Sequence, residues 1–168
     1  MTASNAKNKL IVTTPSDLEI LLTREFDAPR HLVFEALSKA EHVMRWWGPR
    51  STTLLSCEID FRPGGTWHKV LRGPDGREVQ FKGTYHEIVP PERIVATECF
   101  DEPSVGRPEW LATVTLEERG GKTLLTSRVL HKTKENRDGH LGSGMEKGAG
   151  ETFDRLAELL DAWHRGEA

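Results

Sequence analysis

The stretch MRWWGP at residues 44–49 separates a helical part of the chain from a long run of strands. Trp46 and Trp47 are adjacent, so their rings diverge and cannot cover the same surface. Gly48 permits a backbone turn that other residues resist, and Pro49 cannot continue a helix. The stretch therefore predicts a helix end that directs two large rings toward an apolar region, and we expect function to lie near what they cover.

The length and composition limit the class of protein. A chain of 168 residues with a net charge of -3 fits one globular domain and gives no basic surface for nucleic acid. No run reaches the roughly 18 apolar residues of a membrane span. Residues 1–16 are polar and lack the apolar core of a signal peptide. We expect them to be a flexible tail on a cytoplasmic protein, with a single domain at 17–165.

Alternation of apolar and polar residues predicts most of the sheet. Residues 18–26 alternate with a period of two, and Arg24 falls on their apolar side, which predicts an ion pair across the sheet or to the C-terminal helix. Two short helices follow, before Gly48. Turn residues then separate predicted strands at 52–60, 66–72, 78–89, 93–100, 109–118 and 122–131. Strands without intervening helices indicate an antiparallel meander.

The last segment has a helical period instead. Apolar residues recur at three- and four-residue steps, which predicts a long amphipathic helix. They are Met145, Ala149, Phe153, Leu156, Leu160 and Trp163. The fold class is therefore α+β, with a curved antiparallel sheet of about six or seven strands around this helix and two short helices after the first strand.

Several local phrases occur in an order that is typical of one family. They are REFDAP at 24–29, WWGP at 46–49, RPGGTW at 62–67, GPDG at 73–76, GTY at 83–85, PPERI at 90–94, GME at 144–146 and FDRL at 153–156. Together they resemble the family of the activator of the heat-shock-protein-90 ATPase, within the START-like, birch-pollen-allergen-like helix-grip superfamily. The resemblance implies a cavity between sheet and helix.

In that superfamily the cavity binds hydrophobic or amphipathic small molecules. The leading hypothesis is therefore a carrier, sensor or sequestering protein for a hydrophobic or aromatic molecule, with no evident catalysis. One alternative is a chaperone-interaction or stress-response module. The namesake, however, also uses a separate N-terminal domain that this sequence does not contain. The other alternative is an enzyme similar to polyketide cyclases or hydrolases.

Strand alternation and the helix stripe select the candidate ligand-binding residues. They are Trp46, Trp47, Trp67, Lys69, Phe81, Tyr85, Trp110, His131, Met145, Phe153 and Leu156. Aromatic residues of this kind serve equally as ordinary core. Lys69 would recognise an acidic ligand, pair with a carboxylate such as Glu98, or extend its amine to solvent at the rim. His131 is the best candidate for a general base, or a hydrogen-bonded structural histidine.

The sequence contains no motif for a metal or a cofactor. The seven histidines form no HExxH motif and no i, i+4 pair, so we predict no metal site. The glycines at 142–150 follow no strand directly, which argues against a nucleotide loop and favours a loop that leads into the C-terminal helix. No cofactor is predicted. A chaperone or a second copy of the chain remains a possible partner, although no apolar stripe locates such a contact.

Overall fold

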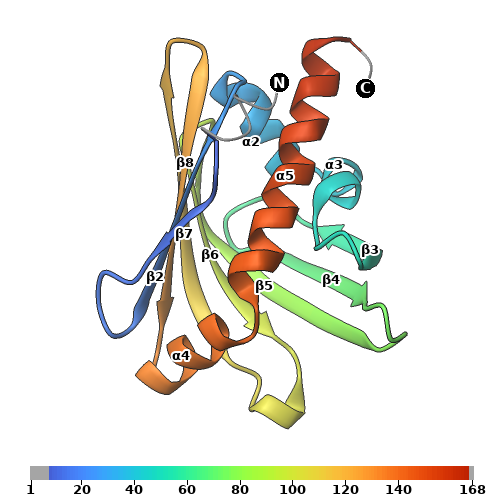
Figure 1. Cartoon of the computed structure of the whole chain (residues 1–168), viewed down its shortest axis with the longest axis vertical. Coiled ribbons are helices and arrows are strands. Elements are labelled where there is room, and N and C mark those ends of the chain that lie inside the picture. Colours follow the sequence, from blue (N-terminus) through green and yellow to red (C-terminus); the bar gives the residue numbers. More distant parts are fainter. Residues whose placement is uncertain (1–7, 167–168) are drawn as a thin grey trace.

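The computed structural model describes residues 8–166, and eight strands in that range form one antiparallel sheet (Figure 1). The strands are β1 (Ile11–Thr13), β2 (Glu19–Phe26), β3 (Thr53–Ile59), β4 (Thr66–Arg72), β5 (Glu78–Val89), β6 (Arg93–Phe100), β7 (Glu109–Arg119) and β8 (Lys122–His131). Their order across the sheet is β1-β2-β8-β7-β6-β5-β4-β3. From β3 to β8 each strand pairs with the next in sequence, which is the predicted meander.

The helices lie on one side of this sheet, and the longest crosses its concave face (Figure 1). They are α2 (Arg30–Ser38), α3 (Ala40–Trp46), the 3-10 turn η1 (Pro103–Val105), α4 (Lys134–Gly142) and α5 (Met145–His164). The apolar stripe of α5 buries Leu156, Leu159 and Leu160. The α+β helix-grip architecture predicted from the sequence is therefore confirmed.

Two elements differ from the sequence-based expectation. β1 lies within the segment expected to be a tail, and it pairs with β2 from Ile11 to Thr13. Three residues are too few to show a strand period, and the pairing partner lies outside the segment. Residues 1–7 of the expected tail lie outside the described residues. Helix α4 replaces part of a predicted loop. It contains few apolar residues, so periodicity does not reveal it, and Thr133 caps its first turn through the amide of Asn136 at 3.0 Å.

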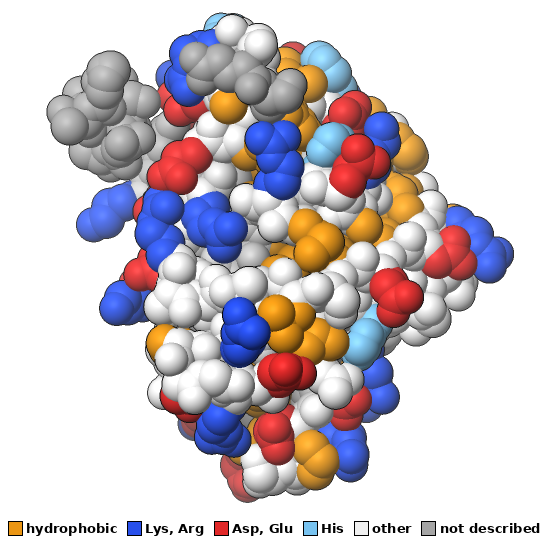
Figure 2. All heavy atoms as spheres, turned by 90° about the vertical axis from the view of Figure 1, so that its right-hand side faces the viewer, with side chains coloured by type: hydrophobic (Ala, Val, Ile, Leu, Met, Phe, Trp, Pro, Cys, Tyr) orange, Lys and Arg blue, Asp and Glu red, His pale blue; other side chains and the backbone are white. Residues whose placement is uncertain are grey.

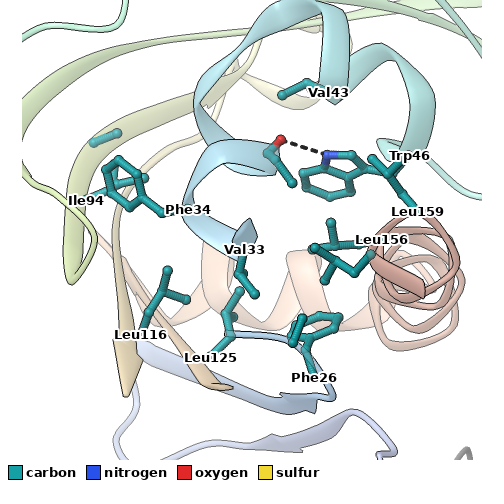
Figure 3. Close-up of a cluster of buried hydrophobic side chains, with 14 of the residues drawn as sticks. Phe26, Val33, Phe34, Val43, Trp46, Ile94, Leu116, Leu125, Leu156 and Leu159 are labelled. Carbon is teal, nitrogen blue, oxygen red and sulfur yellow. Dashed lines mark hydrogen bonds between the residues drawn. The ribbon is translucent and has the colours of Figure 1, made fainter. Parts of the chain in front are cut away.

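The main core fills the space between α2, α3, α5 and one end of the sheet (Figure 3). Leu156 from α5, Val33 from α2 and Leu125 from β8 are each at most 1 % exposed. Trp46 closes this cluster, and its indole nitrogen donates to the carbonyl oxygen of Ala36 at 3.0 Å, drawn as the dashed line in Figure 3. Because a buried indole N–H needs an acceptor, this bond fixes Trp46 in the core.

The helix end at Trp46 is tied to α5. Trp47 is in extended conformation, and Gly48 has a φ of 104°. A Cβ at Gly48 would also lie 2.9 Å from side-chain atoms of Leu71 and Thr52, so glycine is required there for both reasons. Arg155 of α5 donates to the carbonyl oxygens of Gly48 at 2.8 Å and Trp47 at 3.4 Å. The turn is therefore held against α5, and the half-buried Trp47 ring packs against the core cluster that contains Trp46.

Candidate functional site

A cavity of about 720 Å³ lies between the concave face of the sheet and the first half of α5. Its walls come from most strands, from the turn after α3, and from α4 and η1. Most of the lining is apolar or aromatic, with a few polar groups. Figure 2 shows hydrophobic side chains near the centre of one face of the molecule, with charged groups mainly around them. A cavity of this size and lining is typical of small-molecule sites.

One row of residues crosses the cavity face from strand to strand. Trp67 of β4 pairs with Gly83 of β5, which pairs with Glu98 of β6. Glu98 pairs with Trp110 of β7, and Trp110 pairs with His131 of β8. Because directly paired residues project to the same face of an antiparallel sheet, these side chains form a continuous line. The row carries two tryptophans and two titratable groups across an otherwise apolar wall.

Gly83 allows the ring of Trp67 to lie flat over β5. A Cβ at Gly83 would lie 2.5 Å from the indole nitrogen of Trp67 and 2.0 Å from the carbonyl oxygen of Thr97. No side chain fits in that space. The glycine therefore has a packing role, because it leaves room for the Trp67 indole, which also contacts the ammonium of Lys69.

Glu98 is a carboxyl group inside this wall. The indole nitrogen of Trp110 donates to its Oε1 at 2.6 Å. Burial raises the pKa of the Glu98 carboxyl, while the charge of Lys69 and the Trp110 hydrogen bond oppose that rise. Lys69 and Trp110 therefore stabilise the ionised form of this carboxyl group in a largely apolar cavity.

Lys69 contacts two tryptophan rings. Its Nζ lies 4.4 Å from the ring centroid of Trp47 and 4.5 Å from that of Trp67, within the range of a cation–π interaction. Burial lowers the pKa of Lys69, and the charge of Glu98 opposes that change. The side chain keeps some accessible surface, which belongs to the cavity wall. The alternative in which Lys69 extends to solvent at the rim is therefore wrong.

His131 and His140 form a hydrogen-bonded pair at the far end of the row. Nε2 of His131 lies 2.9 Å from Nδ1 of His140, and the ring of Trp110 packs against both imidazoles. Burial lowers the pKa of His131, and it lowers the pKa of His140 to about 4. Both rings are therefore neutral at pH 7, with one N–H shared between them. Nδ1 of His131 is buried without a partner among the described residues.

A second hollow, of about 740 Å³, lies on the other side of α5 and is lined mainly by charged side chains. Arg24 and Asp154 pair across it at 2.7 Å, and Arg50 and Glu158 pair at 2.6 Å. The predicted ion pair from Arg24 to the C-terminal helix is confirmed. Because these charges already neutralise one another, this hollow has no single sign of charge to attract a ligand.

Residues 27–161 match the family described as "Activator of Hsp90 ATPase homolog 1-like protein". The chain belongs to this family. Solved structures agree with the match. A protein from Rhodobacter sphaeroides is 25% identical with a TM-score of 0.83, and the alignment covers 92% of this chain and 99% of that one. A protein from Nitrosomonas europaea is 26% identical with a TM-score of 0.80, covering 90% and 99%. No curated protein matches the chain.

Within this activator-like family member, the structure gathers nearly all the predicted site residues around one cavity. The lining includes Trp46, Trp47, Trp67, Lys69, Phe81, Tyr85, Trp110, His131, Met145 and Phe153. Leu156 is the exception, because it is fully buried in the core cluster and does not line the cavity. Both tryptophans of the pair line the cavity. Trp46 is buried and bonded to Ala36, whereas Trp47 is half-buried and contacts Lys69.

Sequence reasoning missed His140 as a site residue and considered Glu98 only as a partner for Lys69. Alternation along β6 places Glu98 on the same face as Ala96 and Phe100, which would have identified it. No local pattern identifies His140, because the short helix that carries it is polar. Among residues 8–166 no cluster of three or more metal-ligating side chains occurs, and no helix is long and apolar enough to cross a membrane.

Proposed function

We propose that this protein binds a small hydrophobic or amphipathic molecule in the cavity between the sheet and α5. The observation that carries the proposal is the cavity itself, whose volume of about 720 Å³ falls within the roughly 300–1,000 Å³ of known ligand pockets. Membership of the activator-like family agrees with such a role.

The aromatic lining suits a flat, apolar ligand body. Trp47 meets Phe81 edge to face at 5.2 Å between ring centroids, and Phe81 packs on Phe100 at 5.1 Å. Such rings offer large apolar contact area and hold one another in place, so little side-chain freedom is lost when a ligand enters. An aromatic molecule would replace water against these rings.

Intrinsic tryptophan fluorescence tests the proposal directly. Trp47, Trp67 and Trp110 line the cavity, whereas Trp163 packs on His42 away from it, at 4.8 Å between ring centroids. A panel of naphthalene, fatty-acid and flat polycyclic probes should include one that changes the emission and raises the melting temperature. Trp163→Phe should keep that response, and Trp47→Phe should weaken it. If no probe class changes emission or melting temperature, the proposal is wrong.

Catalysis on the bound molecule is the second candidate, because two imidazoles meet inside the cavity. A neutral histidine at 2.9 Å from another can accept a proton and pass charge to its neighbour, as a general base requires. The test separates binding from turnover. In His131→Gln and His140→Gln, an enzyme would lose product formation at unchanged probe affinity, and equal turnover in all three proteins would exclude this role.

Docking on a chaperone through the outer surface stays a prediction, as do a homodimer contact and a cytoplasmic location. The open cavity favours ligand binding over docking, because a docking module needs no internal space. Co-purification of a chaperone with the intact chain, lost on changing exposed residues alone, would reverse that order.

A further inference from the structure

The cavity holds one cation and one carboxylate that do not touch. Among the residues that line it, the charged side chains are Lys69, Glu98 and Glu135, and Glu135 is exposed on α4. Lys69 and Glu98 act on each other's charge without a hydrogen bond between them. His131 and His140 add no charge at pH 7.

The Trp67 ring packs against Lys69 and against β5. It lies over Gly83, the residue paired with Glu98, and its other neighbour is the ammonium of Lys69. The ammonium has no hydrogen-bond acceptor within the described part of the chain, although it carries three donors. Glu98 uses Oε1 for Trp110, and among residues 8–166 no side chain or amide donates to its other oxygen.

Charge balance decides which ligand suits this arrangement. A charge buried without a partner is strongly unfavourable, and a matched pair of opposite sign is tolerated. The empty cavity is already neutral, with one positive and one negative group. An anionic ligand would pair with Lys69 and leave a net negative charge beside Glu98. A cationic ligand would pair with Glu98 and leave a net positive charge beside Lys69.

We propose that the cavity selects an uncharged aromatic molecule that offers a hydrogen-bond acceptor to Lys69 and a hydrogen-bond donor to Glu98. A carbonyl group and a hydroxyl group on one flat ring system meet both needs. The two tryptophans beside Lys69 would pack against the aromatic body, and Lys69 and Glu98 would each form a hydrogen bond with one of its polar groups. This inference rests on the proposed function and specifies the chemical class of its ligand.

The test uses four naphthalene probes of similar size and the intact protein. They are naphthalene, an acetylnaphthalene bearing a hydroxymethyl group, naphthoate, and naphthylmethylamine. Affinities are measured by fluorescence titration at pH 7 in the wild type, Glu98→Gln and Lys69→Met. Both substitutions preserve side-chain size. The glutamine amide oxygen can still accept from Trp110, and melting temperatures confirm that each variant folds.

The wild type should bind the uncharged hydroxymethyl probe about tenfold or more tightly than naphthoate or naphthylmethylamine, because each charged probe leaves one charge in the cavity without a partner. Glu98→Gln removes the negative charge, so naphthoate should gain about tenfold or more. Lys69→Met removes the positive charge, so naphthylmethylamine should gain instead. Each variant should therefore prefer a different charged probe. A uniform loss of packing would weaken all probes alike and would not produce this difference.

Lys82→Met is the matched control, because Lys82 is exposed and its neighbours Phe81 and Gly83 on β5 face the cavity. It should leave all four affinities unchanged. Equal binding of naphthalene and the three polar probes, in the wild type and in both variants, would overturn the selection and leave the proposed function intact. Absence of binding by every probe would overturn both. If one variant fails to fold, the other still shows whether removing one charge raises the affinity for the probe that carries the same charge.

Discussion

Gly83 provides the most stringent test of the cavity wall. In Gly83→Ala the new Cβ would lie 2.0 Å from the carbonyl oxygen of Thr97 and 2.5 Å from the indole nitrogen of Trp67. Contacts below 3.0 Å are essentially never seen for a real Cβ. The backbone of β6 and the Trp67 ring must therefore both shift to accept one methyl group.

The size of the effect follows from two opposing contributions. Overpacking a tight site costs about 3 kcal/mol at its upper range, and the contact with a backbone oxygen places Gly83 there. Replacing glycine by alanine restricts the unfolded chain and recovers about 1 kcal/mol. The net loss in the free energy of unfolding is about 2 kcal/mol, which lowers the melting temperature by roughly 4–8 °C for a domain of this length.

Urea denaturation followed by circular dichroism measures this loss. Gly150→Ala is the control, because the residue lies inside α5 and a Cβ placed there would meet no described atom within 4 Å apart from the chain neighbours and the nearby backbone of the helix. It should stabilise the protein by up to about 1 kcal/mol. A Gly83→Ala protein as stable as the wild type would show that the Trp67 ring does not lie over β5 as described.

Three further predictions concern buried polar groups. Trp46→Phe should lower the free energy of unfolding by about 2 kcal/mol, because it leaves a buried carbonyl without its donor and a gap in the core. Trp47→Phe, in a half-buried ring, should cost under about 1 kcal/mol. Asp154→Ala should cost about 2 kcal/mol, because it leaves the 4% exposed Arg24 without its carboxylate. Arg24→Met should cost less, since Asp154 is 53% exposed and stays hydrated. Lowering the pH from 6.5 to about 4 should remove up to about 3 kcal/mol through His140, because burial holds its folded pKa at about 4 and only the unfolded chain takes up a proton in that window.

Urea midpoints check all three. Equal losses in the two tryptophan variants would contradict the difference in burial and hydrogen bonding between the two rings. A larger loss in Arg24→Met than in Asp154→Ala would show that packing of the arginine stem outweighs its charge. For the pH prediction, the comparison is with His140→Gln, which cannot titrate. The wild type and the variant should differ in slope between pH 6.5 and 4, and identical slopes would refute the buried neutral histidine.

The sheet could be predicted well because its pattern is local. Strands such as Thr66–Arg72 and Arg93–Phe100 have the predicted bounds, since a period of two and turn residues at each end need no distant information. The same alternation placed Arg24 on the inward face before any partner was known. It predicted an ion pair across the sheet or to the C-terminal helix, and the structure shows the second, with Asp154.

The site could be predicted only in part because its polar groups meet through long-range pairing. The row from Trp67 to His131 depends on the register of four neighbouring strand pairs, and a shift of one residue in any of them would break it. His140 joins the row through a polar helix that carries no apolar period. Its contact with His131 arises from the packing of α4 against β8 and β2, which no short stretch of sequence encodes.

The sequence by itself determined which side chains face inward along each strand and that WWGP ends a helix, because both follow from backbone geometry over a few residues. Only the tertiary structure decided that Trp46 is fixed in the core by a hydrogen bond while Trp47 contacts Lys69 in the cavity wall. The physical reason is the partner that each ring can reach. The carbonyl of Ala36 lies within reach of Trp46 inside the helix pair, whereas Gly48 and Arg155 turn Trp47 toward the sheet, where its ring meets Lys69.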